Sequence, residues 1–332
     1  MFDPFNLIER LYPAFDATAR RSAVTLVELA FAEDLGMEMP GLLVDLDHGK
    51  VTLRLESRPG PSGDVTSEAT IPGNARGSAR FVARSAGVIA GIPVVHAAAW
   101  RFGLPTWFEP RVEEGDRVER GTIVAEVFGP MRALLMFERT ALNFLQRLSG
   151  VATLTARYVA EVAGTKAVIL DTRKTTPGWR ALEKYAVRCG GGTNHRFGLY
   201  DQVLIKDNHL AWLVHLGQSD PIGAAVTAAR AKARAGTVIE VEVDSLEQFD
   251  RALECKPDII LIDNLGADAL AEAVRRRDAR APGIQLEASG GVTLATVGAL
   301  ARSGVDRISV GALTHSAPAL DIGLDFERSL PS

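Results

Sequence analysis

Basic side chains gather in residues 168–210 of this chain. They lie directly after two short apolar runs and in the glycine-rich loop between those runs: Arg173, Lys174, His195, Arg196 and Lys206. The formal net charge of the whole chain is only −4, so this concentration of cations is local. An Arg guanidinium presents a planar fork to a carboxylate or phosphate, and a Lys ammonium adds a compact charge. The stretch therefore predicts a binding site for an anion.

A solvated basic surface is the alternative interpretation of such a cluster, because exposed ion pairs are common and weak. These cations instead follow strands and occupy a loop, which are the places where α/β proteins build their sites. The isoelectric point of about 5.9 opposes a nucleic-acid partner, since nucleic-acid-binding domains usually carry a net basic charge. Small anions are therefore the expected ligands.

Length and composition favour a soluble globular protein, with room for two domains. The chain has 332 residues, 47% of them hydrophobic, and no apolar run approaches the roughly 20 residues that span a bilayer. Its first residues lack the basic start and apolar core of a secretory signal, so a cytoplasmic location is expected. Cys189 and Cys255 are too few for a disulfide framework. Cys189 is a candidate nucleophile beside the cations, but packing at a helix end is the favoured interpretation.

Strands and helices alternate through the second half of the sequence. Short apolar runs predict strands at 168–170, 203–205, 238–243, 258–262, 284–288 and 307–310. Helical spacing of apolar residues predicts helices at 179–188, 246–254, 268–277 and 294–303, and a long helix over 134–163 that links two domains. This alternation predicts a parallel α/β arrangement, either a barrel or a doubly wound sheet.

The N-terminal part of the chain has weaker patterns. Residues 5–35 have helical spacing, 50–56 alternate like a strand, and the rest of 37–62 is rich in Pro and Gly without a functional interpretation. Residues 112–127 alternate around two glycine turns, as in lipoyl-type barrels, but carry no lysine for a prosthetic group. We therefore expect a structural role for that segment.

Polar residues stand at the carboxyl ends of successive predicted strands: Lys206, Glu242, Asp263, Ser289 and Gly311. Barrel and open-sheet enzymes carry their sites at this edge. Glu240 and Glu242 share one face of a strand that is otherwise apolar, and such a pair is costly to bury without a function. One such residue is weak evidence, but five in order, together with the cations above, predict an active site.

Glycine motifs follow the last two predicted strands. Ser289-Gly290-Gly291 precedes a helix, and Gly311 comes one strand and helix later. Glycine lets the backbone approach a ligand, and the amides at a helix N-terminus bind anions. Either motif alone is a common turn, but the two in successive units predict a cradle for a phosphate group.

Nine motifs are specific as a set, although each alone is weak: GDVTSEATIP, FERTALNFLQRLSGVAT, LDTRKTTPG, KYAVRCGGGTNHRFGLYD, LIKDNH, EVEVDS, DIILIDN, LEASGGV and DRISVGALTHS. On these motifs the sequence resembles the quinolinate phosphoribosyltransferase family over nearly its whole length. The clearest departure is the region 37–62, which is longer than expected between EDLG and GDVT. This departure concerns local structure near the domain or dimer surface.

The resemblance implies an open or incomplete α/β barrel over residues 138–332 and an N-terminal α/β sandwich domain over 1–137, with 37–62 as an insert. It implies that the C-terminal tail packs back on the N-terminal domain, and that chains form a homodimer, or a higher oligomer, with shared active sites. The implied reaction converts quinolinate and phosphoribosyl pyrophosphate to nicotinate mononucleotide, pyrophosphate and CO₂ in NAD biosynthesis, with Mg²⁺ as cofactor.

The resemblance also implies roles for the residues singled out above. The carboxylates of quinolinate are held by Arg173, His195, Arg196, Lys206 and, from the neighbouring subunit, Arg139. Lys174, near the pyrophosphate, is assigned to catalysis with Glu242 and Asp263, which take the ribose hydroxyls directly or through Mg²⁺. The 5-phosphate is assigned to a cradle with His315 nearby: Ser289, Gly290, Gly291 and Gly311. Such catalysis works by positioning and fixed charge, without a covalent nucleophile.

Three alternatives share parts of this pattern. A sister transferase of the same fold would act on another planar acid, and the relative rates with quinolinate and nicotinate distinguish it. A barrel lyase or epimerase acting on a phosphosugar would share the phosphate cradle but would not need the cations Arg173, Arg196 and Lys206. A phosphosugar-binding regulator would keep the glycines but would gain little from Glu242 and Asp263.

Overall fold

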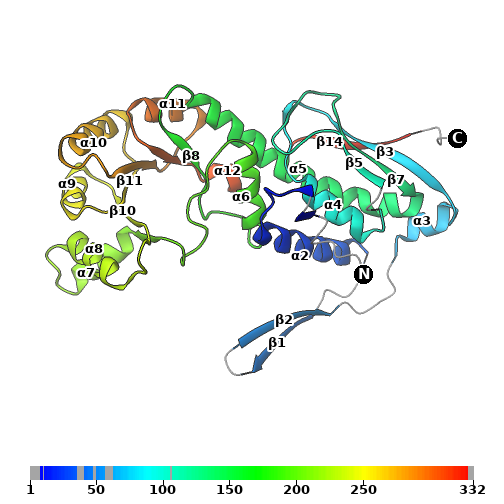
Figure 1. The fold of residues 1–332 in the computed structure, drawn as a ribbon, viewed down its shortest axis with the longest axis horizontal. Coiled ribbons are helices and arrows are strands. Elements are labelled where there is room, and N and C mark those ends of the chain that lie inside the picture. Colours follow the sequence, from blue (N-terminus) through cyan, green and yellow to red (C-terminus); the bar gives the residue numbers. More distant parts are fainter. Residues whose placement is uncertain are drawn as a thin grey trace. The chain divides into compact units, whose positions relative to one another are not determined.

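The computed structural model describes the chain in six ranges: 8–9, 11–35, 41–47, 50–56, 63–104 and 107–327, with the backbone alone described for 41–47 and 50–56. The chain divides into two compact units. The first consists of Met1–Thr153, Pro177–Cys189 and Pro318–Ser332, and the second of Leu154–Thr176 and Gly190–Ala317 (Figure 1). Each unit has its own sheet.

A six-stranded sheet forms the centre of the second unit, and all its neighbouring strands run parallel. In spatial order the strands are β8 (Val168–Leu170), β13 (Arg307–Ser309), β12 (Gln285–Ser289), β11 (Ile259–Asp263), β10 (Ile239–Val243) and β9 (Val203–Ile205). β8 and β9 are the two edges, so the sheet is an open α/β sheet and does not close into a barrel. The prediction of an open or incomplete α/β barrel is thereby confirmed.

Helices connect these parallel strands, as parallel pairing requires. In chain order they are α7 (Asp207–His215), α8 (Pro221–Lys232), α9 (Leu246–Cys255), α10 (Ala267–Arg280) and α11 (Leu294–Arg302), and the short α12 (Ala312–His315) follows the last strand, β13. Figure 1 shows α9, α10 and α11 along the outer side of the sheet. The central strand β11 is buried over Ile259 to Ile262 because helices and neighbouring strands enclose it. The six strands predicted from the sequence are all present.

The first unit contains a four-stranded antiparallel sheet. Its order is β14 (Ile322–Phe326), β3 (Arg76–Ala83), β7 (Ile123–Pro130) and β5 (Phe108–Pro110). A two-stranded sheet of β4 (Gly87–Val88) and β6 (Arg117–Val118) lies in the same unit. The short strands around Gly115 and Gly121, both with positive φ, account for the alternating pattern of 112–127.

Helices complete the first unit: α2 (Ala17–Asp34), α3 (Val65–Thr70), α4 (Ile92–Arg101), α6 (Arg180–Cys189) and most of α5 (Met131–Glu161). α4 contacts β5 of the sheet, and α2 packs on α4 and α6. α4 is buried almost all round, from Ile92 to Ala99. The ring of Phe81 lies 6.1 Å from that of Phe108 and 5.9 Å from that of Phe137, in edge-to-face geometry. The strand β14 joins this unit because Ile322 pairs with Ala83 across the sheet.

The helical conformation expected over residues 5–35 is interrupted in the structure. The described residues show helical conformation at Ile8, Glu9 and Leu11, followed by a turn, and α2 begins only at Ala17. The Asp16 carboxylate accepts hydrogen bonds from the amides of Thr18 and Ala19, both at 2.9 Å, and so caps the new helix. Pro13 lies in the turn, where it interrupts the helical hydrogen bonds.

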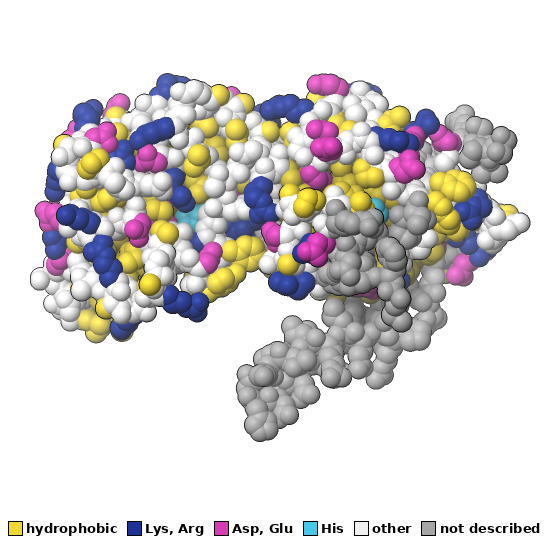
Figure 2. Space-filling model, viewed as in Figure 1, with side chains coloured by type: hydrophobic (Ala, Val, Ile, Leu, Met, Phe, Trp, Pro, Cys, Tyr) yellow, Lys and Arg dark blue, Asp and Glu magenta, His cyan; other side chains and the backbone are white. Residues whose placement is uncertain are grey.

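The strand predicted at 50–56 is confirmed as β2 (Lys50–Glu56), which pairs with β1 (Gly41–Asp47) in an antiparallel hairpin. The rest of the predicted insert, at 37–40, 48–49 and 57–62, lies outside the described residues. None of the described helices combines the length and the hydropathy that crossing a membrane requires. Figure 2 shows Lys and Arg side chains interspersed with Asp and Glu over the visible face, in keeping with the small net charge.

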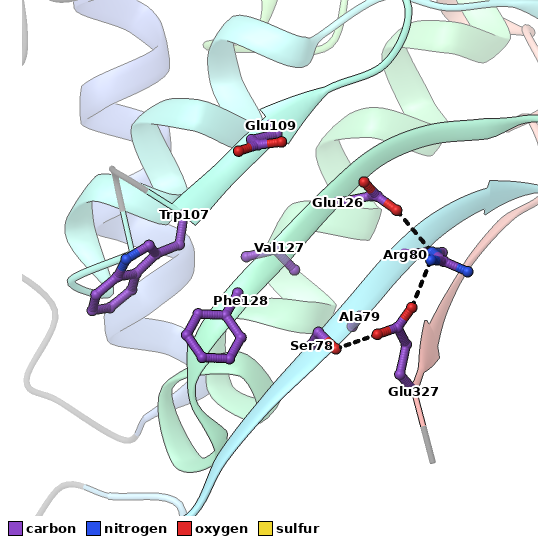
Figure 3. Close-up of a pocket in the computed structure, with 9 residues that line it drawn as sticks. All are labelled: Ser78, Ala79, Arg80, Trp107, Glu109, Glu126, Val127, Phe128 and Glu327. Carbon is purple, nitrogen blue, oxygen red and sulfur yellow. Dashed lines mark hydrogen bonds and ion pairs between the residues drawn. The ribbon is translucent and has the colours of Figure 1, made fainter. Parts of the chain in front are cut away.

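A shallow cavity of about 340 Å³ lies on the antiparallel sheet of the first unit (Figure 3). Its wall carries an ion-pair chain in which Arg80 contacts Glu126 at 2.8 Å and Glu327 at 2.7 Å, and Ser78 donates to Glu327. These charges already satisfy one another, so the cavity presents little that would select a charged ligand.

Cys189 is the last residue of α6, and its Sγ atom lies 3.5 Å from the Glu114 carboxylate. Partial burial and then the charge of Glu114 raise the pKa of the Cys189 thiol. A thiolate is therefore disfavoured, and the geometry supports packing at a helix end over a nucleophilic role. The same carboxylate caps α4, since Glu114 accepts from the amide of Ile92 at 2.7 Å and from that of Gly91 at 3.0 Å.

Replacing Glu114 by Ala should lower the free energy of unfolding by about 1–3 kcal/mol, because two amides at the start of α4 lose their acceptor. Urea unfolding followed by Trp fluorescence measures this effect in a Trp212→Phe background, since the other three tryptophans, at 100, 107 and 179, belong to the first unit. Glu113→Ala, an exposed neighbour, should stay within about 0.5 kcal/mol of the parent. Equal effects of the two variants would contradict the capping role.

Candidate active site

A cavity of about 390 Å³ lies at the carboxyl edge of the parallel sheet in the second unit. Its wall is formed by the ends of the strands and by the loops after β8 and before β9: Thr172, Arg173, Lys174, His195, Arg196, Leu204, Lys206, Glu242, Leu261, Asp263, Ser289 and Ser309. Eight of the residues singled out in the sequence are among them. The parallel strands therefore bring together side chains that are more than 100 positions apart in the chain.

The cationic part of the wall comes from two loops and one strand end. Arg173 and Lys174 follow β8, Arg196 lies in the loop 190–202, and Lys206 directly follows β9. Burial and then the repulsion of Arg173 lower the pKa of the Arg196 guanidinium, which nevertheless keeps its charge. Like charges held this close together are stabilised by an anion between them.

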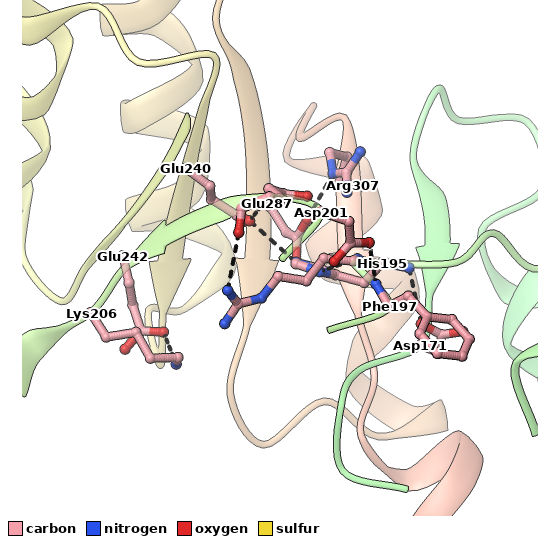
Figure 4. Close-up of polar contacts among 11 residues, drawn as sticks. Asp171, His195, Phe197, Asp201, Lys206, Glu240, Glu242, Glu287 and Arg307 are labelled. Carbon is pink, nitrogen blue, oxygen red and sulfur yellow. Dashed lines mark hydrogen bonds and ion pairs between the residues drawn. The ribbon is translucent and has the colours of Figure 1, made fainter. Parts of the chain in front are cut away.

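The acidic part of the wall comes from β10 and β11. Glu242 forms an ion pair with Lys206, with 2.5 Å between the carboxylate oxygen and Nζ, as Figure 4 shows. Asp263 ends β11 and accepts a hydrogen bond from the Asn264 side chain at 2.7 Å. Both carboxylates also line a neighbouring cavity of about 340 Å³. Glu242 and Asp263 thus lie between two adjacent cavities, where a polyhydroxylated or cationic ligand would reach them.

The glycines predicted to cradle phosphate do not line the cavity themselves. Gly290 has a φ of +89°, and a Cβ atom there would lie 2.2 Å from Asn264 Oδ1 and 2.8 Å from the Asn264 backbone nitrogen. A Cβ atom on Gly311 would approach the His315 ring at 3.1 Å and the Lys174 side chain at 3.2 Å. Gly291, by contrast, faces open space. Close contact with Asn264 explains why position 290 requires glycine. Gly311 lies beside both His315 and Lys174.

His195 joins the loop 190–202 to two buried carboxylates of the sheet (Figure 4). Its Nε2 atom lies 3.3 Å from Glu240 on β10 and 3.4 Å from Glu287 on β12, and both acids have no exposed surface. The backbone amide of Arg196 approaches its Nδ1 atom at 2.7 Å. Its own amide donates to the Asp171 carboxylate at 2.9 Å. The ring is thus held on both of its nitrogen atoms.

Opposing effects act on the charge of His195. Burial by itself lowers the pKa of the imidazole, but the hydrogen bonds with Glu240 and then Glu287 outweigh burial and raise the pKa to about 9. The Arg196 amide facing Nδ1 instead favours the neutral ring, because that nitrogen then acts as an acceptor. Nε2 carries a proton in either form, since two carboxylates face it.

Arg139 is an exposed residue of α5 in the first unit and is not among the residues that line the cavity. The other predicted cations and acids meet in the second unit as described. The expected role of Arg139, which would reach the site of a second subunit, therefore stays a prediction.

The two domain models of the quinolinate phosphoribosyl transferase family match the chain, the N-terminal domain over residues 64–149 and the C-terminal domain over 151–325. The chain belongs to this family. A relative from Mycobacterium leprae, nicotinate-nucleotide pyrophosphorylase [carboxylating], is 47% identical over 267 residues, which cover 79% of this chain and 91% of the relative. A probable nicotinate-nucleotide pyrophosphorylase [carboxylating] from Bacillus subtilis is 42% identical and covers 81% and 89% of the two chains.

Solved structures agree with this membership of the quinolinate phosphoribosyl transferase family. The nicotinate-nucleotide pyrophosphorylase from Francisella tularensis superposes with a TM-score of 0.76 at 32% identity, covering 92% of this chain and 96% of that chain. The protein from Ehrlichia chaffeensis with the same name gives a TM-score of 0.76 at 32% identity, covering 91% and 97%. The fold and the family assignment therefore rest on independent comparisons.

Several residues of the site were not predicted from the sequence. Thr172 and Ser309 line the cavity, and the buried acids Asp171 and Glu287 hold His195 in place. Glu287 carried a usable signal, because an acid between Leu286 and Ala288 in the predicted strand repeats the pattern of Glu240. The role of Asp171 had no such signal, since its partners lie in a loop more than 20 residues away.

The imidazole of His195 should stabilise the folded protein more at about pH 6 than at about pH 9.5. Folding raises its pKa from 6.5 to about 9, so the stabilisation is fully present below about pH 6.5 and is lost as the pH rises through about 9. The melting temperature of His195→Gln should therefore lie furthest below that of the wild type at the acidic end. His215→Gln, at an exposed position of α7, serves as the control. A deficit of His195→Gln that grows with pH would contradict the assignment.

Proposed function

We propose that this chain transfers the phosphoribosyl group of phosphoribosyl pyrophosphate to quinolinate with loss of CO₂, and so forms nicotinate mononucleotide and pyrophosphate in NAD biosynthesis. The observation that carries the proposal is the divided charge of the cavity. Cations from β8, β9 and the loop between them stand opposite acids from β10 and β11. This division suits a dicarboxylate and a ribose side by side, within a chain that belongs to the quinolinate phosphoribosyl transferase family.

Quinolinate is proposed to bind by its two carboxylates to the cations Arg173, Arg196 and Lys206, with the His195 ring in the same wall of the cavity. Lys206 has to exchange its partner, because Glu242 holds its ammonium in an ion pair. A substrate carboxylate that takes over Lys206 frees Glu242 to face the sugar. Binding of one substrate thus prepares the acid that serves the other.

Glu242 and Asp263 are proposed to hold the ribose hydroxyls and to place negative charge near the sugar carbon that becomes cationic as pyrophosphate leaves. Lys174 would stabilise the departing pyrophosphate, with Ser289, Gly290, Gly291, Gly311 and His315 around the 5-phosphate. No group in this scheme forms a covalent intermediate. The rate enhancement would come from holding the reacting atoms in position and from fixed charges aimed at the transition state.

Mg²⁺ fits the two carboxylates that stand between the adjacent cavities. Protein sites for Mg²⁺ with nucleotide-like substrates commonly use one or two carboxylates and take the remaining ligands from phosphates and water. Glu242 and Asp263 would hold the ion, directly or through the substrate hydroxyls. When bound, it would neutralise charge on the pyrophosphate.

Loss of CO₂ is proposed to follow the attack of the ring nitrogen on the sugar carbon. The nitrogen lone pair forms the new bond to the sugar, and the bond to pyrophosphate breaks with its electron pair. The resulting positive ring nitrogen stabilises the electron pair that stays on the adjacent ring carbon when the carboxylate leaves as CO₂. A proton from solvent then adds to that carbon and gives nicotinate mononucleotide. Release of CO₂ from quinolinate without phosphoribosyl pyrophosphate would contradict this order.

Two chains are proposed to form a homodimer in which Arg139 of each subunit completes the site of the other. Exposure of Arg139 on α5 supports this assignment, because an exposed cation is available to a second chain. A cytoplasmic location is proposed as well, and two free thiols, Cys189 and Cys255, are compatible with that reducing compartment.

A coupled assay with quinolinate, phosphoribosyl pyrophosphate and Mg²⁺ tests the proposed reaction. Nicotinate mononucleotide and CO₂ should form in equal amounts, and nicotinate in place of quinolinate should react more slowly. Arg139→Ala and Lys206→Ala should each be inactive as homodimers, since each site then lacks a carboxylate ligand. Refolding the two variants together should restore roughly a quarter of the wild-type activity, because half of the random dimers carry one intact site of two.

The result of that mixing identifies where Arg139 acts. No recovery of activity would show that Arg139 serves its own chain or has no part in the site. Product formation with another planar acid but not with quinolinate would keep the phosphoribosyl transfer and change the acceptor.

Replacing Glu242 by Gln should separate binding from catalysis. Quinolinate affinity should stay within about tenfold of wild type or become tighter, because Lys206 loses the acid that competes with the substrate. Turnover should fall by roughly 100-fold, since the ribose loses an acidic partner near the developing positive charge. Equilibrium binding of quinolinate and single-turnover rates measure the two effects. Loss of quinolinate affinity with normal turnover would show that Glu242 does not serve the sugar.

A further inference from the structure

Glu240 and Glu287 are the acids of the sheet that the proposed reaction leaves unused. Neither side chain has any exposed surface, and neither lines the cavity. They stand on β10 and β12, on either side of the central strand β11. Burying a carboxylate costs several kcal/mol unless charged or hydrogen-bonding groups compensate it. Two such groups inside one sheet therefore need an explanation.

Protein groups donate to one carboxylate oxygen of each acid, while the Oε1 atoms of Glu240 and Glu287 have no hydrogen-bond partner. The Arg307 guanidinium donates to Glu287 at 2.7 Å, and the Gln202 side chain donates to Glu240. The His195 Nε2 atom lies within 3.4 Å of both. Arg307 comes from the neighbouring strand β13, whereas Gln202 and His195 both come from the loop 190–202. The acids thus hold that loop at two points.

The loop is tied down further along its length. Thr193 bridges to Leu170 at the end of β8, and the Asp171 carboxylate accepts from the amide of His195 and from the side chain of Asn194. The Arg196 guanidinium donates to the carbonyl of Gln202 at 3.3 Å. These contacts surround the one residue of the loop, Arg196, whose guanidinium lines the cavity as a permanent cation.

Both ring nitrogens of His195 are engaged by the protein itself. Nε2 faces the two carboxylates (Figure 4). Nδ1 receives the backbone amide of Arg196 at 2.7 Å. The ring of His195 therefore lines the cavity with its carbon atoms, while its two nitrogen atoms contact the buried acids and the backbone of the loop 190–202. The backbone amide that contacts Nδ1 belongs to Arg196, the residue that is proposed to bind the substrate.

We infer that Glu240 and Glu287 are positioning residues that act through His195 to hold Arg196 in the cavity wall. The inference rests on the proposed function, in which Arg196 binds a carboxylate of quinolinate. It assigns His195 to the placement of Arg196 and not to direct contact through a ring nitrogen. Loss of either acid loosens the loop and displaces the guanidinium, and an error of about 1 Å in such a group is enough to weaken substrate binding strongly.

A buried metal site is the competing interpretation of the same three side chains. The candidate ligand atoms of His195, Glu240 and Glu287 lie within 4.8 Å of one another. Arg307 and Gln202 already donate to these carboxylates, and an adjacent guanidinium repels a cation. The network approaches neutrality without a metal ion, because Arg307 balances Glu287 and burial raises the pKa of Glu240.

Imidazole NMR of the wild-type protein tests the inference without depending on turnover. In protein labelled with ¹⁵N-histidine, with His195 assigned by its absence from His195→Gln, Nε2 should be protonated. It should remain so, with little change in shift, when quinolinate is added. A ring nitrogen of His195 that changes its protonation or hydrogen bonding on addition of quinolinate would overturn the inference. If quinolinate is not a substrate at all, the ligand-free spectrum still reports whether the acids hold Nε2–H.

Variants then separate positioning from plain stability. Glu240→Gln and Glu287→Gln should each raise the KM for quinolinate by roughly tenfold, with less than about a threefold change in kcat or in the KM for phosphoribosyl pyrophosphate. Glu183→Gln is the matched control, because Glu183 is a fully buried acid paired with Arg147 in the first unit. It should lose thermal stability but keep the KM for quinolinate. Unchanged KM values in both sheet variants would overturn the inference.

Conservative replacements of His195 add a second readout. His195→Gln keeps an amide N–H near the position of Nε2 and should retain more activity than His195→Ala. Equal loss in the two would indicate direct contact between the imidazole and the substrate. Calorimetric titration of the wild type with Zn²⁺ covers the competing interpretation. One tightly bound equivalent that disappears in Glu287→Gln would make the cluster a metal site and overturn the positioning role.

Discussion

The burial of two carboxylates within a parallel sheet constrains the rest of the second unit. Glu240 and Glu287 need donors, and a sheet of apolar strands supplies only Arg307 from within itself. The remaining donors come from the loop 190–202, and His195 fixes this loop against the strands through its contacts with both acids. Its neighbour Arg196 is thereby carried to the cavity wall. A local electrostatic requirement inside the sheet thus determines the position of a cation at its edge.

The cavity itself shows a second, more labile arrangement of charge. Lys206 and Glu242 neutralise each other across the wall, at the edge of the sheet. Arg307, Gln202 and His195 hold the buried network, whereas this ion pair lies at the cavity wall and, in the proposed reaction, exchanges its partners for the substrates. The combination provides a rigid frame with one exchangeable contact. Such a frame suits a reaction that relies on fixed charge and on the position of the reacting atoms.

The sequence predicted the strands of the parallel sheet well because apolar runs bounded by polar residues are a strong local signal. It did not reveal α7 and α8, where the pattern of buried residues is sparse: only Leu210 in α7, and Ile222 and Val226 in α8, are buried. The helix α4 was missed for the opposite reason. It is enclosed almost all round, so its sequence lacks the polar face that marks a surface helix.

By itself the sequence determined which residues follow the strands, and therefore most of the cavity: the cations at 173, 174, 196 and 206 and the acids at 242 and 263. Parallel strands end at one edge, so their terminal residues meet whatever the strand order. The network below that edge was decided only by the tertiary structure. Glu240 and Glu287 face one histidine because β11 lies between their strands and β13 beside them. Strand order and register arise from packing of the whole unit, which no local pattern of residues encodes.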